Sequence, residues 1–334
     1  MEITPKNQNT VPASESKIRN RLKTWPNSIT PEECTQKTFI KLNLKTVEQQ
    51  CDVKSKVLSH WWYTDYADDI IDELRKSESL RVEFYRQSPQ IAYRNHCVNF
   101  MREVVESEFL SRTTLHLGNI FLDIFFFIDA LTNAVFCGCF SGIYYLDVFM
   151  DRHRIAADRL SLVVLCCLGL AAKLEDRDQD VPKYSDLNSQ MNDVYTIKDY
   201  AKLEGMIMQS FGFKLIYPTA AVFVEYYIEA SINETDFQKC DQRFNSYVDM
   251  KAAVASLVLE VLDLILNDRE MVQILPSKSS AACIAAGRKL AGIENVWTTE
   301  LALLTNYLFK DIEQLTQDLM NCHSEMTHNI PMGL

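Results

Sequence analysis

Glycine and proline are both scarce in this sequence of 334 residues, with nine of each. Apolar residues recur mostly at helical spacing, and together with this scarcity they predict a mainly α-helical fold. No G-x-G-x-x-G or phosphate-loop glycine pattern is present, so the common sequence signature of a nucleotide-binding enzyme is missing. No nucleophile, base and orienting residue stand together in a recognisable motif, and we therefore expect no enzymatic activity.

Positive charge is also in short supply. The chain has 34 Lys and Arg residues against 45 Asp and Glu residues, which gives a formal net charge of -11. Nucleic-acid binding depends on clustered basic side chains that release counterions from phosphates. We therefore expect no nucleic-acid partner, and we expect an acidic chain of this kind to bind other proteins.

The cysteines do not form the pattern of a disulfide framework or a zinc site. The ten cysteines stand at irregular spacings inside apolar segments, as Cys166 and Cys167 do in LSLVVLCCLGL, and this is typical of reduced, buried thiols. Cys137 and Cys139 form C-x-C, but no nearby Cys or His pair completes a metal-binding set. We expect no metal, no cofactor and, because MEITPKNQNTVPASES lacks the apolar stretch of a signal peptide, an intracellular protein.

The polar N-terminal part changes to an amphipathic helix near His60. Residues 1–55 are rich in Thr, Asn, Gln, Glu and Lys, which predicts a disordered tail because little apolar surface is available for burial. Beyond it, apolar residues recur every four positions on one face of a predicted helix: Trp62, Tyr66, Ile70 and Leu74. Such a helix needs a partner surface.

The remaining pattern predicts two helical bundles. The segment Leu160 to Leu174 is apolar on almost all sides, which is typical of a central helix enclosed by others. The next helix has capping signals at Thr196 and Asp199 and a terminating Gly212. Further helices are predicted at 219–231, 243–266, 278–291 and 298–322. We therefore expect an all-α fold with a first bundle in 56–216, a second in 217–323 and a tail at 324–334.

Several segments in this order resemble the cyclin family, over about residues 60 to 322. The most specific is DVFMDRHRIAADRLSLVVLCCLGLAAKLED, and WWYTDYADDIIDELRKSE and QSPQIAYRNHCVNFMREVV are similar to the helices that precede it in cyclins. VPKYSDLN and YPTAAVFVEYYIEASINETD resemble the cyclin J subfamily. The resemblance implies two consecutive five-helix bundles, the cyclin boxes, preceded by an N-terminal helix.

The resemblance also implies a partner, a cyclin-dependent protein kinase, and the residues that bind it. Such kinases need a Lys to Glu ion pair whose formation depends on the position of one kinase helix, and cyclins hold that helix in place. At the matching positions here stand Lys173 and Glu204, and Glu175, Tyr66 and Ile70 are further expected contacts. The alternative for such charges is an ordinary solvated Lys and Glu.

The helix that cyclins use to dock Arg-x-Leu substrates departs from the family pattern. The matching positions hold Tyr93, Arg94, Cys97, Phe100 and Glu103. His96 stands where apolar groove residues are usual, and Asn99 stands where Asp is usual, so the predicted groove is weakened.

The N-terminal tail contains a match to the destruction-box pattern. In RNRLKTWPN the pattern is carried by Arg19, Leu22 and Asn27, which makes a ubiquitin ligase a possible further partner. The alternative is a basic stretch of tail with no such role.

An apolar insertion, NIFLDIFFFIDALTNAVFCGCFSGI at about 119–143, splits one expected helix of the first box. Ala130 to Leu146 is a charge-free run near the lower limit of membrane-spanning length. Three readings stay open: a retained intron, an exposed apolar excursion, or a membrane span. We expect no membrane association, because no basic cluster flanks the run and a span would pull a box helix from its core.

One alternative to a kinase regulator stays open. A cyclin-fold adaptor of the transcription-factor type would bind partners without activating a kinase, and the lack of a basic stripe argues against its DNA-holding form. The expected compartment is the nucleus and also the cytoplasm, since kinase regulators of this type work mainly in the nucleus.

Overall fold

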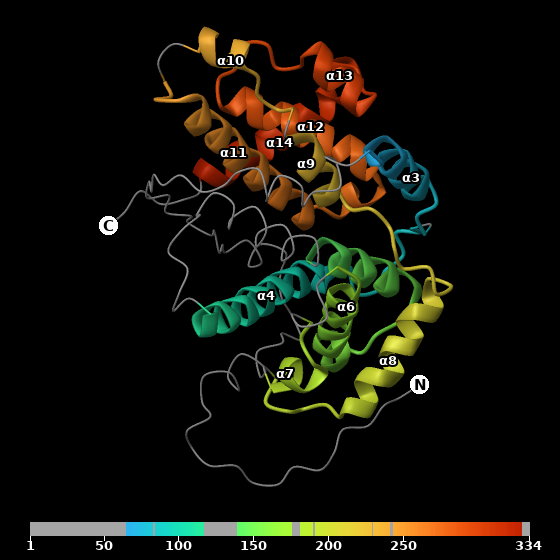
Figure 1. Ribbon diagram of the computed structural model, residues 1–334. Helices are drawn as coiled ribbons and strands as arrows, with labels where there is room; N and C mark the ends of the chain where they lie inside the picture. Colours follow the sequence, from blue (N-terminus) through green and yellow to red (C-terminus); the bar gives the residue numbers. More distant parts are fainter. Residues whose placement is uncertain are drawn as a thin grey trace. The chain divides into compact units, whose positions relative to one another are not determined.

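Helices are the regular elements of every part of the chain that the structure describes, in agreement with the predicted all-α fold. The computed structural model describes residues 65–82, 84–116, 139–175, 181–189, 191–228, 230–240 and 243–328 (Figure 1). Contacts between Cα atoms divide the chain into two units. Unit 1 contains Val82–Ile216, and unit 2 contains Cys51–Arg81 with Tyr217–Leu334.

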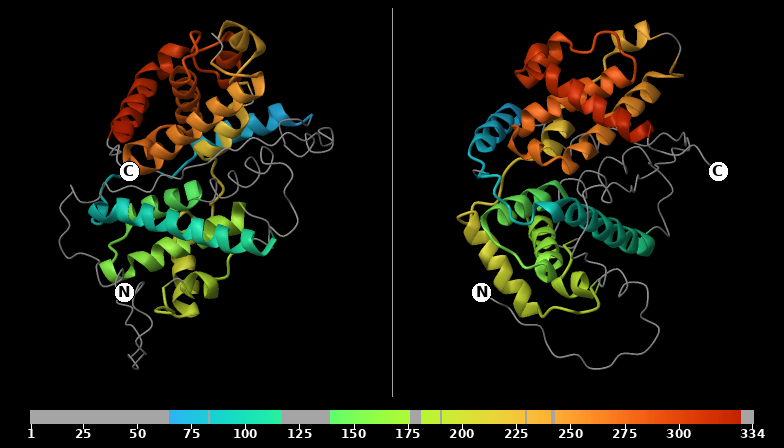
Figure 2. Two further views of the ribbon diagram at one scale, coloured as in Figure 1. Left: turned by 90° about the vertical axis from the view of Figure 1, so that its left-hand side faces the viewer. Right: turned by 180° about the vertical axis from the view of Figure 1, so that it is seen from behind.

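Unit 1 is built around α6 (Leu160–Glu175), the central helix predicted from its apolar sequence. Every residue of α6 from Leu160 to Ala172 is buried. Helices packed against it, as Figures 1 and 2 show, include α4 (Arg94–His116), α7 (Tyr184–Ser189) and α8 (Ile197–Ser210). Two short 3₁₀ helices, Ile91–Tyr93 and Ala157–Arg159, lead into α4 and α6.

A further helix of unit 1 covers residues 139–152, and its residues from 139 to 151 are all buried. The sequence placed 139–143 in the apolar insertion, and the structure shows that these residues are helical and buried. A β-carbon added at Gly142 would lie 3.0 Å from Sδ of Met101, which shows how closely this helix approaches α4. Residues 119–138 lie outside the described part of the chain. Among the helices described, none is long and apolar enough to cross a membrane.

A buried ion pair joins α4 to the helix 139–152. Nε and Nη2 of Arg94 donate to the two carboxylate oxygens of Asp147 at 2.7 and 2.8 Å. Both side chains are only 3% exposed. The two-pronged geometry fixes the relative position of the helices and compensates each buried charge.

The start and end of α8 follow the predicted signals. Thr196 and Asp199 form a capping box, in which each side chain accepts a hydrogen bond from the other residue's backbone N–H. Gly212 follows the helix with a φ of 58°, the left-handed conformation expected of a glycine that ends a helix. Both expectations are confirmed.

Unit 2 repeats the plan of a buried central helix. α12 (Pro276–Leu290) is rich in small residues and is buried over most of its length. The helices packed around it are α3 (Ala67–Ser79), α9 (Ala220–Ile228), α11 (Tyr247–Asn267), α13 (Thr299–Thr305) and α14 (Phe309–His328). A β-carbon at Gly287 would lie 2.4 Å from Cγ2 of Val258, so only glycine permits this close approach of α12 to α11.

Two sequence expectations for unit 2 need correction. The helix predicted at 298–322 is divided into α13 and α14, because Asn306 adopts a left-handed conformation with a φ of 56°. The N-terminal helix α3 was grouped with the first bundle but belongs to unit 2. Glu78 accepts hydrogen bonds from the backbone N and Oγ of Ser277 at 2.9 and 2.6 Å, at the N-terminus of α12. This favourable contact of a carboxylate with a helix N-terminus was not visible in the sequence.

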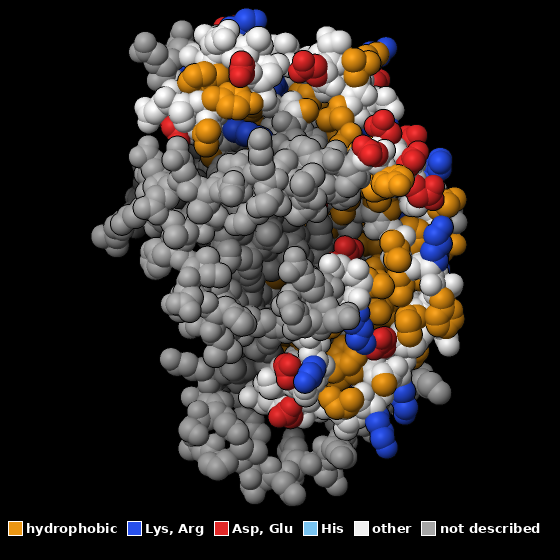
Figure 3. Space-filling model, viewed as in Figure 1, with side chains coloured by type: hydrophobic (Ala, Val, Ile, Leu, Met, Phe, Trp, Pro, Cys, Tyr) orange, Lys and Arg blue, Asp and Glu red, His pale blue; other side chains and the backbone are white. Residues whose placement is uncertain are grey.

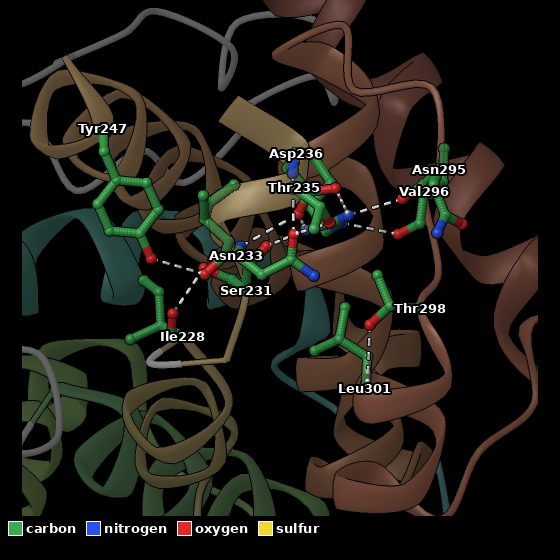
Figure 4. A network of polar contacts seen from close by, with 12 residues as sticks. Ile228, Ser231, Asn233, Thr235, Asp236, Tyr247, Asn295, Val296, Thr298 and Leu301 are labelled. Carbon is green, nitrogen blue, oxygen red and sulfur yellow. Dashed lines mark hydrogen bonds and ion pairs between the residues drawn. The ribbon is translucent and has the colours of Figure 1, made fainter. Parts of the chain in front are cut away.

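A second buried Arg to Asp pair organises the far end of α12. Arg288 is fully buried, and its Nη1 and Nη2 donate to the carboxylate of Asp236 at 2.9 and 3.2 Å. Its N–H groups also donate to the backbone carbonyls of Ser231, Asn295 and Val296, and Figure 4 labels these three residues together with Asp236. Asp236 belongs to the short helix α10 (Glu234–Lys239), and a 3₁₀ helix at Arg269–Gln273 follows α11. The pair therefore ties two connecting segments to the central helix.

The buried pair of unit 1 gives a stability prediction. Arg94→Met leaves the Asp147 carboxylate buried without its partner, and we expect the free energy of unfolding to fall by about 3–5 kcal/mol. The double variant Arg94→Met with Asp147→Leu removes both charges and should lose clearly less. Urea unfolding followed by circular dichroism measures both. Equal losses in the single and double variants would contradict the assigned role of the pair.

Candidate functional site

Lys173 and Glu204, the two principal predicted site residues, meet at the surface of unit 1. Nζ of Lys173, in the last turn of α6, lies 2.8 Å from each carboxylate oxygen of Glu204 on α8. The Lys173 side chain is 39% exposed and that of Glu204 is 17% exposed. The pair therefore joins two helices and still presents its charges to a partner.

Tyr184, from α7, also contacts Lys173. The Lys173 Nζ atom lies 4.5 Å from the centre of the Tyr184 ring, within the range of a cation–π contact. The Tyr184 ring stacks on Tyr200 with centres 4.9 Å apart. A β-carbon at Gly169 would lie 2.7 Å from Cε1 of Tyr184, so α6 carries glycine where this ring packs. The sequence did not reveal Tyr184, because α7 is too short for its contacts to be inferred from periodicity.

The inner side of this cluster is a protonated thiol. Sγ of Cys166 lies 3.8 Å from the Tyr184 hydroxyl and donates to the backbone carbonyl of Tyr200 at 3.7 Å. Burial raises the pKa of Cys166 to about 12. Burial, followed by the neighbouring Cys166 and Glu204, also raises the pKa of Tyr184. Both groups are therefore uncharged near pH 7, and the charged groups of Lys173 and Glu204 adjoin uncharged side chains.

An apolar stripe on α8 adjoins the ion pair. Ile197, Ala201, Glu204 and Met208 follow the i, i+4, i+7, i+11 spacing of one helix face. Ile197 and Ala201 are exposed, and this face lies beside the buried stripe of Tyr200, Leu203 and Ile207. Hydrophobic side chains gather in the space-filling view over the region where Figure 1 draws α8 (Figure 3). Exposed apolar side chains bordered by polar groups are typical of a protein-binding surface.

Phe213, just beyond α8, adds an exposed aromatic ring. Its backbone N–H bonds to the Met208 carbonyl at 2.9 Å, which closes a Schellman motif after Gly212. Phe213 has a φ of 63°, a left-handed conformation that is costly for a bulky residue, and it is 68% exposed. Phe213 was not among the predicted site residues. The sequence signal that could have indicated it is an aromatic residue directly after the glycine that ends a helix.

The other predicted kinase contacts have different surroundings. Glu175 is exposed and accepts a hydrogen bond of 2.8 Å from Oγ of Ser141, so the helix 139–152 supports it. Tyr66 is exposed at the start of α3, and Ile70 is half-buried one turn later. Because these last two belong to unit 2, their part in the same surface stays a prediction.

The predicted substrate-docking residues include two that form core instead. Arg94 is engaged with Asp147, and Cys97 is fully buried, so neither side chain lines the docking groove, which the sequence had predicted to be weakened. Tyr93 and Phe100 are half-buried and Glu103 is exposed, and docking at these three stays a prediction. Burial lowers the pKa of His96, against an opposing effect of Glu103.

Some sequence expectations fall outside the described residues. They are the destruction-box residues Arg19, Leu22 and Asn27, and Cys137 of the C-x-C pair. Cys139, the other member of that pair, is buried in the helix 139–152.

Two family descriptions match this chain in succession. "Cyclin, N-terminal domain" matches residues 137–216, and "Cyclin, C-terminal domain" matches residues 218–331. The boundary between the two matches coincides with the boundary between the two structural units. With the paired helical bundles and the α6–α8 ion pair, these matches show that the chain belongs to the cyclin family.

Individual relatives refine this assignment. The chain is 30% identical to Cyclin-J of Xenopus laevis over 273 residues, which cover 79% of the chain and 63% of that protein. Its identity to human Cyclin-J is also 30%, with 62% of that protein covered. It is 25% identical to the G2/mitotic-specific cyclin-A of Drosophila melanogaster over 268 residues. The chain thus matches about three fifths of the length of the cyclin J proteins, and the similarity to cyclin J predicted from the sequence is confirmed.

The protonated, buried state of Cys166 can be tested chemically. Because the thiolate is the reactive form and burial raises the pKa of Cys166 to about 12, alkylation at about pH 8 should be very slow in the folded protein. Exposed Cys322 provides the internal comparison, and we expect it to be alkylated well before Cys166. Peptide mass spectrometry after timed iodoacetamide treatment gives both rates. Equal rates in the folded chain would contradict the packing beneath Tyr184.

Proposed function

We propose that this cyclin-family chain binds and activates a cyclin-dependent protein kinase through the surface formed by the end of α6, α7 and α8. The observation that carries the proposal is the partly exposed Lys173–Glu204 pair, joined at 2.8 Å and bordered by apolar side chains of α8. The pair stands at the positions that the cyclin resemblance assigned to the kinase contact. The chain would regulate phosphoryl transfer without supplying a catalytic group.

The proposed mechanism is a shift in the kinase's own conformational equilibrium. A protein kinase is active only when one of its helices places a Glu against the Lys that binds the ATP phosphates. A partner that binds the active arrangement more tightly shifts the population toward it. In this proposal the polar groups of Lys173 and Glu204 engage the kinase beside that helix, and the apolar stripe packs against it.

The apolar residues would supply most of the affinity. Binding energy at interfaces concentrates in a few large side chains that become fully desolvated, with charged pairs giving orientation. Phe213 and Ile197 are large, exposed and on the same unit as the ion pair. We propose them as the main apolar contacts, with Met208 between them in sequence.

The relatives indicate the process that such a kinase complex would serve. One relative is named a G2/mitotic-specific cyclin-A, which associates that protein with a stage of cell division. We propose a role in cell-cycle control for this chain, exercised in the nucleus. A ubiquitin ligase acting on Arg19, Leu22 and Asn27 stays a prediction from the sequence.

Removing the ion pair should abolish kinase binding while the fold survives. For Lys173→Ala with Glu204→Ala we expect loss of co-purification with every cyclin-dependent kinase that the unaltered chain retains. Truncating desolvated interface charges costs binding free energy of about 2–5 kcal/mol. The folded pair itself is partly exposed, so its loss should change unfolding little.

A matched control is available on the same helix. Lys202 is exposed on α8 and lies on the side away from the Ile197–Glu204 face. Lys202→Ala removes one positive charge and should leave co-purification unchanged. Undiminished binding by the double variant, or equal loss in the control, would exclude the proposed contact.

Phe213 offers a variant in which stability and binding should move in opposite directions. Asn tolerates the left-handed conformation better than Phe, so Phe213→Asn should raise the free energy of unfolding by up to about 1 kcal/mol. Loss of the aromatic ring should weaken kinase binding by at least about tenfold. Thermal unfolding and surface-binding kinetics measure the two effects. A variant that binds as tightly as the unaltered chain would remove Phe213 from the proposed interface.

A further inference from the structure

We propose that Tyr184 is a positioning residue that holds the ammonium group of Lys173 ready for the kinase before the kinase arrives. This inference rests on the proposed function, because it concerns the same surface. Tyr184 itself need not touch the partner. Its effect on binding would pass through Lys173.

The contacts of Lys173 show how the positioning would work. Its Nζ atom contacts two groups of negative potential, the Glu204 carboxylate at 2.8 Å and the face of the Tyr184 ring, whose centre lies 4.5 Å away. A lysine paired only with a carboxylate at the surface keeps much of its rotational freedom. A second contact with an aromatic ring restricts that freedom, and so reduces the entropy that binding would otherwise lose.

The Tyr184 ring is itself fixed by three neighbours from two helices. It stacks on Tyr200 of α8 at 4.9 Å, and its hydroxyl lies 3.8 Å from Sγ of Cys166 on α6. Gly169 leaves the room that the ring occupies, since any β-carbon there would lie 2.7 Å from Cε1 of Tyr184. A ring fixed in this way can orient a flexible lysine.

These contacts also separate the two possible roles of Tyr184. A ring needed only to fill space would be replaceable by an apolar side chain of similar size, such as Leu. A ring that acts on Lys173 would be replaceable by Phe, which keeps the π face, but not by Leu. Tyr184→Phe and Tyr184→Leu therefore form a matched pair of variants.

The first test needs no kinase. A proton held over the face of an aromatic ring resonates upfield, so the ε-methylene protons of Lys173 should be shifted upfield in the unaltered chain and in Tyr184→Phe. In Tyr184→Leu they should return toward the position of an ordinary lysine. The signal is assigned by its loss in Lys173→Arg. An unchanged lysine signal in Tyr184→Leu would overturn the proposal.

The second test measures kinase affinity in a double-variant cycle. Tyr184→Leu should weaken binding about fivefold, whereas Tyr184→Phe should bind as the unaltered chain does. In a Lys173→Ala background, Tyr184→Leu should have almost no further effect. An equal loss in both backgrounds, or equal losses for Leu and Phe, would overturn the positioning role.

A second variant keeps the test decisive if Tyr184→Leu folds poorly. Gly169→Ala retains the tyrosine but displaces its ring. Like Tyr184→Leu, it should abolish the upfield shift of the Lys173 protons and weaken kinase binding. Failure of the two proposals can be told apart. If Lys173→Ala leaves kinase binding intact, the proposed function fails, whereas if it abolishes binding and Tyr184→Leu does not weaken it, only this inference fails.

Discussion

The bidentate ion pair between Arg94 and Asp147 is the constraint on which unit 1 depends most. It joins α4 to the helix 139–152. The 22 residues of chain between these two helices lie outside the described structure. The same helix carries Asp151, which accepts hydrogen bonds from the backbone N–H groups of Tyr85 and Gln87. Because each of these carboxylates is buried, its partners are required, and the arrangement of the surrounding segments follows.

The helix 139–152 also sets the position of the proposed kinase-binding surface. The hydroxyl of Tyr145 donates to the Leu215 carbonyl at 2.9 Å, close to the end of α8, and Ser141 supports Glu175 at the end of α6. Lys173 stands one residue beyond the last buried residue of α6, so its stem starts from a rigid core and its charge reaches the surface. A rigid base beside the exposed and partly strained Phe213 suits the proposed kinase-binding role of this surface.

Local signals in the sequence predicted the parts of the fold that local physics decides. The Thr196 capping box, the Gly212 terminus and the buried helices α6 and α12 each follow from a few neighbouring residues. The sequence could not reveal features decided by contacts between distant segments. Glu78 draws α3 to α12 through Ser277, which is 199 residues away, and Tyr184 gains its role only from helices α6 and α8. The Lys173 and Glu204 positions came from family resemblance, while their pairing came from the structure.

Hydrogen exchange of the chain with and without a bound cyclin-dependent kinase tests the central claim most directly. The account predicts slower exchange in the kinase complex at the end of α6, in α7, along α8 and through Phe213. In the same experiment, the Lys173→Ala, Glu204→Ala double variant should show no kinase-dependent protection there. Protection confined to other helices, with α6 to α8 unchanged in a complex that forms, would contradict the assignment of this surface to the kinase.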